Sequence, residues 1–483
     1  MRKTITTLLA LLPLAMLAAE RKPNFLFVYT DDQRWDAMSV VQREQGERAR
    51  FPWFQTPNMD RLAAEGVRFR NAFVTLPLCA PSRAAFLTGR YNHLNGVAGN
   101  RVPFPTNNVT HASLMRAAGY ATAYIGKWHM GGQRGQRPGF GYSASFIGQG
   151  RYWDCPFEIN GQTTPTTGWV DDVSTDYAIQ FIKAHRNQPF SVVVGFKACH
   201  GPNEPPTRAK DRFPDTTARP VPNLDVRPIY RLPENEPAAK AQVDGTFAKA
   251  LTTGVGYFRC ISAADDNLGR LLKTLDELEL AQDTVVVFAS DNGYYKGEHG
   301  LGDKRSAYEE SLRIPLLLRY PRLVQKSKLL DEMVLNIDLA PTFLDLAGVP
   351  VPPEMQGRSW RPLLGGKPSG WRKSFLAEYF MENQFPGTPT LVAVRTADAK
   401  LIKYSGHDEW TELFDLAKDP YETKNLAADP AHKALLAKMQ AELDQQAKLT
   451  QYRVPDYADK PVKGDQPAAR KAGKKKKKKA GTE

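Results

Sequence analysis

The amino-acid sequence predicts an α/β fold, with a large, mainly parallel sheet flanked by helices and a smaller C-terminal α+β domain. Three observations predict it. Short apolar runs alternate with helical patterns from Asn24 to about Pro350. Four of these runs lead directly into polar residues. From Gly365 onward, short strand-like segments and one long helical pattern replace the alternation.

The length of 483 residues is enough for one large core and a second, smaller domain. We expect four parts: a signal peptide at 1–19, a catalytic domain at 20–364, a small C-terminal α+β domain at 365–455 and a disordered basic tail at 456–483. Among the four cysteines there is no C-x-x-C pair, which argues against a structural zinc site.

The first residues resemble a secretory signal peptide. Arg2 and Lys3 precede an apolar run from Leu8 to Leu17, and the small residues Ala18 and Ala19 follow. Such a run is too short to span a membrane, and no later segment is long and apolar enough to do so. We therefore expect a periplasmic or secreted protein without a membrane span.

The net charge of +13 is concentrated at the C-terminal end. Eight positive charges come from Arg470, Lys471 and the run 474–479. A lysine run of this kind is typical of a solvated, disordered extension, and it could also tether the chain to anionic glycans. The basic residues are not interleaved with a nucleic-acid reader motif, so the sequence does not predict nucleic-acid binding.

Several segments predict the elements of the two domains. Short apolar runs typical of buried strands and helical patterns of apolar residues account for most of the first domain. The expected strands are Asn24–Thr30, Tyr120–Ile125, Ser191–Phe196 and Asp283–Ser290, and the expected helices are 57–65, 82–88, 261–278 and 338–347. In the second domain we expect strands at 374–380, 391–395 and 400–404, and a helix at 430–449.

Two long stretches break the alternation. Residues 131–168 are rich in glycine and aromatic residues, and residues 201–237 are rich in proline and charge. Both are too long to be simple connections, so we expect loops that contact the substrate.

Polar residues follow all four expected strands of the first domain. They are Asp31 and Asp32, Lys127 and His129, His200, and Asp291 and Asn292. Each alone is more often a turn or cap residue. Because ligands of open parallel sheets bind beyond the carboxyl ends of the strands, four such groups together predict a binding site.

The acidic members of this set offer only oxygen ligands, which suit calcium or magnesium and not zinc. Without an ion, Asp31 and Asp32 would repel Asp291, and a pKa would have to rise. Lys127 and His129 are two residues apart, so in an extended segment they would project to the same side. A lysine there can neutralise charge and a histidine can move a proton, although a lone histidine is also common as a satisfied polar residue at a core edge.

The string Cys79-Ala80-Pro81-Ser82-Arg83 lies at the entry to the helix expected at 82–88. Unpaired N–H groups at a helix entry, together with Arg83, could hold an anionic group against the Cys79 side chain. A buried structural cysteine beside a surface arginine is the alternative, and the five residues alone favour neither. A disulfide among Cys155, Cys199 and Cys260 is possible but not required.

This string, followed by Leu87-Thr88-Gly89-Arg90, resembles the signature of the formylglycine-dependent type I sulfatases, in the alkaline phosphatase-like superfamily. Gly126 to Gly131, Gly297 to Lys304 and Tyr308 to Ser311 are similar to other segments of that family. The similarity extends from about Pro23 to Leu449. At Cys199 the chain departs from the family, where proline often precedes the histidine.

The resemblance implies a hydrolase that cleaves sulfate esters. A maturase would oxidise Cys79 to formylglycine (3-oxoalanine), the hydrated nucleophile. One calcium ion (Ca²⁺) would be held by Asp31, Asp32, Asp291, Asn292 and the group at Cys79. The other catalytic residues would be Arg83, Lys127, His129, His200 and Lys304. His299 would support its loop.

The glycine-rich segments at 139–142 and 148–150 are similar to sulfatases that act on glycans, which implies a sulfated mono- or oligosaccharide as substrate. Two alternatives stay open. A phosphonate monoesterase or phosphodiesterase of the same superfamily can also use formylglycine. A catalytically inactive, glycan-binding protein, helped by the lysine tail, is the second.

Overall fold

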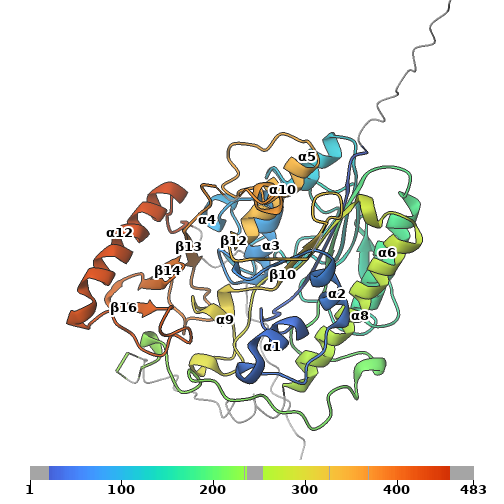
Figure 1. The fold of residues 1–483 in the computed structure, drawn as a ribbon. Helices are drawn as coiled ribbons and strands as arrows, with labels where there is room; N and C mark the ends of the chain where they lie inside the picture. The colour runs from blue at the N-terminus through green and yellow to red at the C-terminus, as the bar shows by residue number, and fades with distance from the viewer. Residues whose placement is uncertain (1–20, 233, 236–253, 326, 368, 457–483) are drawn as a thin grey trace, which may run out of the picture.

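The computed structural model describes residues 21–232, 234–235, 254–325, 327–367 and 369–456 (Figure 1). The predicted signal peptide at 1–19 and residues 457–483 of the predicted tail lie outside the described residues. The structure contains both of the expected domains. The boundary between them at residue 364 stays a prediction.

A ten-stranded mixed sheet forms the centre of the larger part. Its strand order is β11-β2-β10-β9-β1-β8-β4-β5-β6-β7, and the five strands from β9 to β5 are parallel. These five are β9 Thr284–Ser290, β1 Asn24–Thr30, β8 Phe190–Gly195, β4 Ala121–Lys127 and β5 Tyr142–Phe146. At the two ends lie β2 Val67–Phe69, β6 Phe157–Ile159, β7 Gln162–Thr164, β10 Leu316–Arg319 and β11 Lys328–Leu330.

All four strands predicted for this sheet are present, and they are neighbours in the order β9-β1-β8-β4. The expectation for residues 131–168 was wrong in part, because this stretch contains β5, β6 and β7 and continues the sheet instead of forming one loop. Residues 201–232, by contrast, contain only short turns of 3-10 helix between loop segments.

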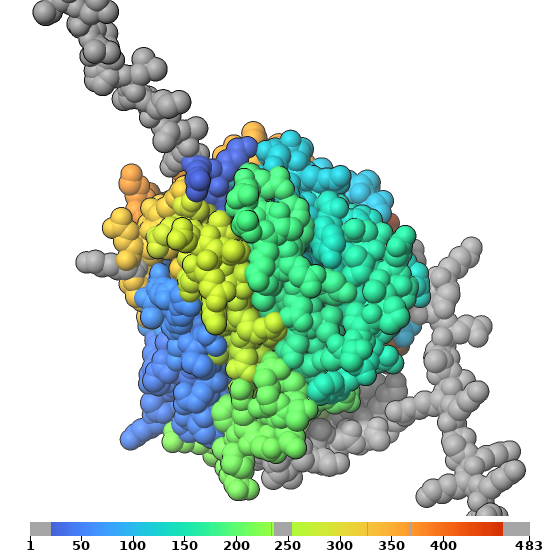
Figure 2. All heavy atoms as spheres, turned by 90° about the vertical axis from the view of Figure 1, so that its right-hand side faces the viewer, coloured from blue at the N-terminus to red at the C-terminus, as the bar shows by residue number. Residues whose placement is uncertain are grey.

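Helices cover both faces of the sheet because the side chains of β1 alternate between two apolar cores. Leu26 and Val28 pack under α2 Pro57–Glu65 and α8 Val255–Glu277, while Phe25 and Phe27 pack under α3 Cys79–Thr88 and α10 Leu339–Leu346. On the first face α8 lies between α2 and α6 Val170–Ala184, as Figure 2 shows. The predicted α/β class with helices on both sides is thus confirmed.

The smaller C-terminal part has an antiparallel sheet of four strands with a helix packed on it. The strands are β13 Ser374–Tyr379, β14 Leu391–Thr396, β15 Ala399–Tyr404 and β16 His407–Asp415. The helix α12, Lys433–Thr450, lies against β13, β14 and β15 (Figure 1). It begins three residues later than predicted because residues 430–432 form a 3-10 turn.

The remaining elements are short. They are α1 Ser39–Gln45, α4 Asn92–Asn95, α5 His111–Ala117, α9 Glu309–Leu312, α11 Arg361–Leu364, β3 Ala72–Phe73 and β12 Val334–Leu335. Across the described ranges, no helix has the length and apolar character needed to cross a lipid bilayer.

The end of β4 depends on a glycine. Gly126 has φ 88°, and a Cβ atom there would lie 2.1 Å from the carbonyl oxygen of Gly195 on β8. We expect Gly126→Ala to lower the free energy of unfolding by at least about 1–2 kcal/mol, the cost of a left-handed backbone, with the overlap adding to it. Urea unfolding measures this. Gly132→Ala is the control, because a Cβ there meets no atom within 4 Å; equal midpoints for the two variants would contradict the prediction.

Candidate active site

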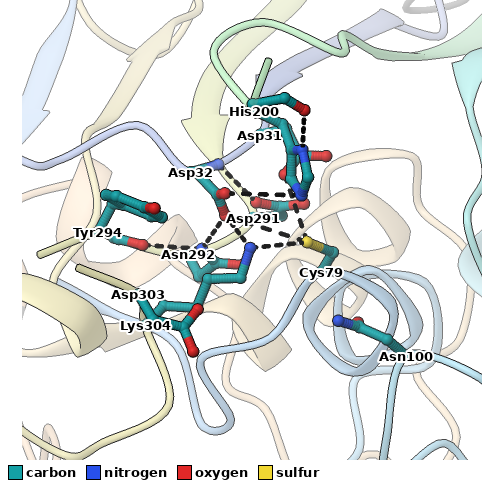
Figure 3. A network of polar contacts seen from close by, with 12 residues as sticks. Asp31, Asp32, Cys79, Asn100, His200, Asp291, Asn292, Tyr294, Asp303 and Lys304 are labelled. Atoms are coloured by element: carbon teal, nitrogen blue, oxygen red, sulfur yellow. Dashed lines mark hydrogen bonds and ion pairs between the residues drawn. The ribbon is translucent and has the colours of Figure 1, made fainter. Parts of the chain in front are cut away.

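The polar residues that follow β1, β8 and β9 meet at one edge of the sheet (Figure 3), and Lys127 at the end of β4 joins them through its contact with Asp31. Backbone hydrogen bonds continue beyond the strands: Asp31 N donates to Ala198 O at 2.7 Å, and Asp291 N donates to Thr30 O at 3.0 Å. These bonds fix the main chain at the point where the side chains leave it. The predicted meeting of the strand ends is therefore present.

Cys79 is fully buried and is the first residue of α3, so the helix begins three residues before its predicted start. Its Sγ lies 3.3 Å from Asp31 Oδ1 and 4.0 Å from Asp32 Oδ1, and Lys304 Nζ lies 3.3 Å from it. Burial, and next the charge of Asp31, raises the pKa of the Cys79 thiol well above its usual range. An unmodified Cys79 is thus a protonated thiol and a poor nucleophile at neutral pH.

Arg83 is buried, so the alternative of a surface arginine is wrong. Its Nε and Nη2 donate to Asp291 Oδ2 at 2.9 and 2.7 Å, and Nη2 also donates to Asp31 Oδ2 at 2.9 Å. Nη1 donates to the backbone oxygen of Lys127. The guanidinium therefore joins the ends of β1, β4 and β9, one turn into the helix from Cys79.

The carboxylates of Asp31, Asp32 and Asp291 and the sulfur of Cys79 offer ligand atoms that all lie within 4.8 Å of one another. Burial raises the pKa of Asp31, but the charges of Lys127, His200 and Arg83 outweigh it and hold this pKa well below its usual value. Burial, and next the charge of Asp31, raises the pKa of Asp291 to about 7. The predicted rise of one carboxyl pKa in this cluster is present at Asp291.

Asn292 completes this set of oxygen atoms. Its Nδ2 donates to Asp32 Oδ1 at 2.7 Å and to Gly293 O at 2.8 Å. Its Oδ1 is buried and has no hydrogen-bond partner among the described residues. An orphaned carbonyl oxygen beside three carboxylates fits a hard cation such as calcium, because a bound ion would satisfy that oxygen and offset the repulsion.

Lys127 and His129 flank Trp128 but do not project from one strand face. Lys127 is the last residue of β4 and donates to Asp31 Oδ2, while His129 has φ 48° and leaves the extended conformation. The expectation that an extended backbone aligns the two side chains was wrong. Both instead contact Gln149, which follows β5.

His200 and Lys304 reach the cluster from loops. His200 Nε2 lies 3.9 Å from Asp32 Oδ2, and its side chain is 22% exposed, so it forms the open side of the cluster. Burial and the charge of Lys127 lower the pKa of His200 to about 4. Lys304 Nζ donates to Asp32 Oδ1 at 2.5 Å. Burial lowers the pKa of Lys304, but Asp32 and Cys79 raise it further, so the net shift is well above the usual value.

The other sequence-based expectations have mixed outcomes. His299 is buried and stacks on Tyr308 with ring centroids 3.9 Å apart, which fits support of its loop. All four cysteines are described, free and buried, so the possible disulfide is absent.

The sequence prediction omitted two residues of the site, Gln149 and Lys197. Both follow strand ends at the same edge, and the rule used for the other residues would have found Gln149 had β5 been predicted.

Comparison with known proteins identifies the family. A family model described as "Sulfatase" matches residues 23–349, and one described as "N-sulphoglucosamine sulphohydrolase, C-terminal" matches residues 297–449. The chain belongs to the sulfatase family. It is a sulfuric ester hydrolase with the alkaline phosphatase-like fold.

This sulfatase is 33% identical to the N-acetylglucosamine-6-O-sulfatase of Bacteroides thetaiotaomicron, over 92% of the chain and 91% of that protein. It is 29% identical to the ulvan-active sulfatase of Formosa agariphila, over 88% of the chain and 80% of that protein. A solved structure of a protein in complex with its substrate D-glucosamine-2-N,6-O-disulfate superimposes with a TM-score of 0.81 at 30% identity, covering 90% of this chain and 99% of that one.

We expect Arg83→Leu to destabilise this sulfatase by about 3–5 kcal/mol, because Asp31 and Asp291 would lose their shared partner inside the protein. The unfolding midpoint in urea, without added metal, measures the change. Arg61→Leu is the matched control. Arg61 also pairs with two carboxylates, Glu65 and Asp276, each at 2.8 Å, but all three side chains are over a third exposed, so we expect it to cost no more than about 1 kcal/mol. Similar unfolding midpoints for both variants would show that the pairing of Arg83 with Asp31 and Asp291 contributes little to the stability of the fold.

Proposed function

We propose that this sulfatase hydrolyses sulfate esters of sulfated mono- or oligosaccharides, using a formylglycine formed from Cys79 and one calcium ion. The observation that carries the proposal is the meeting of the buried Cys79 side chain with three carboxylates and the Lys304 ammonium. The saccharide substrate is supported by the relatives named for N-acetylglucosamine-6-sulfate and ulvan, and by the glucosamine disulfate complex.

Asp31, Asp32, Asp291 and Asn292 would hold the ion together with the group at position 79. When present, the ion polarises sulfate oxygens, and the hydrated aldehyde of formylglycine supplies the nucleophile. Arg83 holds Asp31 and Asp291 in place through three hydrogen bonds. Its contribution to the reaction would be to hold these two ligands in position beside the reacting group.

The remaining residues would act on the sulfate group and on protons. Lys304 Nζ lies 3.3 Å from the position of Cys79 Sγ, so its ammonium stands beside the reacting atom and stabilises negative charge there. The departing sugar oxygen would take its proton from Lys304, whose raised pKa keeps it charged, or from His200 at the open side if that ring is protonated when substrate binds. Burial and the charge of Lys127 hold the pKa of His129 well below its usual value, so His129 is a neutral base that accepts the proton whose removal releases sulfate.

The location and maturation of the protein are part of the same proposal. The sequence at residues 2–19 supports export to the periplasm or beyond the cell. A maturase that forms formylglycine would have to reach Cys79 before folding is complete, because the folded chain buries this residue fully.

A protein named as a phosphonate hydrolase shares this fold. A phosphonate monoester hydrolase from Silicibacter pomeroyi superimposes with a TM-score of 0.70 at 21% identity, covering 88% of this chain and 95% of that one. Parallel assays on matched aryl sulfate and aryl phosphonate esters, and on N-acetylglucosamine-6-sulfate, separate the two activities. A higher kcat/KM for the phosphonate ester would overturn the proposed substrate class.

We expect Cys79→Ala to lower sulfate release by on the order of 1000-fold or more, because the nucleophile is lost while the fold stays intact. Sulfate release measures the loss of activity, and circular dichroism checks that the fold is intact. Mass spectrometry of the wild-type peptide shows whether residue 79 carries an aldehyde. Cys155→Ala is the control, since Cys155 is buried outside the cluster. Turnover by Cys79→Ala at the rate of Cys155→Ala would refute the scheme.

We expect chelation to stop sulfate release and Ca²⁺ to restore it. Calcium at 100 times its Kd should also raise the free energy of unfolding by about 2.7 kcal/mol. Asn292→Leu should reduce this gain, whereas the buried Asn95→Leu, which lacks contact with the cluster, should retain it. The same calcium response in both variants would remove Asn292 from the ligand set.

A further inference from the structure

Gln149 connects two residues of the proposed machinery. Its Oε1 accepts a hydrogen bond from Lys127 Nζ, and its Nε2 lies 2.9 Å from His129 Nε2. Lys127 Nζ donates in turn to Asp31 Oδ2. A single side chain from the loop after β5 thus links the base, a lysine of the site and a carboxylate.

The hydrogen-bonding capacity of the three groups fixes which atom faces which. An ammonium group can only donate, so Lys127 requires the amide oxygen of Gln149. The amide nitrogen, which also can only donate, is then directed at His129 Nε2. That ring nitrogen must be the acceptor, and the proton of a neutral ring must reside on Nδ1. His129 Nδ1 is buried and has no hydrogen-bond partner among the described residues, so no donor there favours the opposite tautomer.

The backbone holds Gln149 in this position. Its carbonyl oxygen accepts a hydrogen bond from Lys197 Nζ at 3.0 Å, which ties the loop to the segment after β8. Gly150 has φ 59°, and a Cβ there would lie 2.5 Å from the ring of Phe146. The loop is therefore built to place residue 149 close against the ends of β4 and β8.

We propose that Gln149 is a positioning residue, which keeps His129 in the tautomer with an unprotonated Nε2 and holds Lys127 between its amide and Asp31. This inference rests on the proposed function, in which His129 is the base. Its Nε2 lone pair accepts the Gln149 N–H in the resting site and would have to exchange that hydrogen bond for the proton during turnover. The charged and titratable groups that act on His129 are Lys127, Asp31, Arg83 and His200.

The sharpest test is Gln149→Glu, which keeps the size and shape of the side chain but can only accept hydrogen bonds. A carboxylate between Lys127 and His129 would favour a protonated ring, so the neutral base would persist only at higher pH. We expect the acid limb of the kcat–pH profile to move up by about 1–3 pH units. A role in packing alone would leave this limb in place. Gln149→Leu should lower kcat on the order of 10- to 100-fold, with a smaller change in KM.

Gln133→Glu is the matched control. The Gln133 side chain accepts a hydrogen bond from Trp128 Nε1 at 2.9 Å and donates one to Phe104 O at 3.2 Å. The Gln133→Glu substitution therefore adds the same negative charge near residues 127–129, but at a side chain whose hydrogen bonds go to Trp128 and Phe104 and not to His129. We expect its acid limb to coincide with that of the wild type. An equal shift in both Glu variants, or no shift in Gln149→Glu, would overturn the role of Gln149.

A second measurement does not depend on turnover. In the Cys79→Ala protein labelled with ¹⁵N-histidine, NMR should show His129 with a protonated Nδ1 and an unprotonated Nε2, and Gln149→Leu should lose this preference. A protonated Nε2 in the presence of Gln149 would refute the proposal. If the wild type releases no sulfate, the proposed function fails while the spectrum still decides the tautomer; if it is active and neither variant differs from it, only the role of Gln149 fails.

Discussion

The structure of the site depends on one buried arginine. Asp31 and Asp291 come from neighbouring parallel strands and lie on the same edge, where two desolvated carboxylates repel each other strongly. The guanidinium of Arg83 donates to both, and its planar fork suits this task better than a lysine would. Because Arg83 lies one turn after Cys79 on α3, the same contact that pairs the carboxylates also sets the position of Cys79 against them.

The sheet makes this arrangement possible. Strands β9, β1, β8 and β4 are parallel and adjacent, so four chain segments far apart in sequence end within reach of each other. Each strand is buried on both faces, so its end is held in place by packing. The residues that directly follow each strand therefore have a fixed starting point. The loops add the remaining side chains of the site. Lys304 contacts Asp32 and Cys79, His200 is partly exposed to solvent, and Gln149, in the loop after β5, contacts Lys127 and His129.

The sequence predicted the parts of this arrangement that depend on apolar runs. Four buried strands were recognisable, three of them rich in valine or phenylalanine, and so were the polar residues after them. Strand β5 was not, because its Ser143 and Ser145 are buried yet polar, so the segment lacks an apolar run. Gln149 was missed for the same reason. The positive φ of His129 and the burial of Arg83 were also unpredictable locally, since both follow from partners that are distant in the chain.

The charge balance of the site gives a reason for its selectivity. Asp31, Asp32 and Asp291 oppose Arg83, Lys127 and Lys304, so the six buried side chains sum formally to zero. A divalent ion held by the three aspartates, as proposed above, would make this balance positive. Burial, and next the charge of Asp31, raises the pKa of Asp291 to about 7, and such an ion would offset the repulsion between these carboxylates. A positive, desolvated cluster around Cys79 favours an anionic group over a neutral ester. Ion and sulfate ester should therefore bind cooperatively, each offsetting charge that would be costly to bury alone.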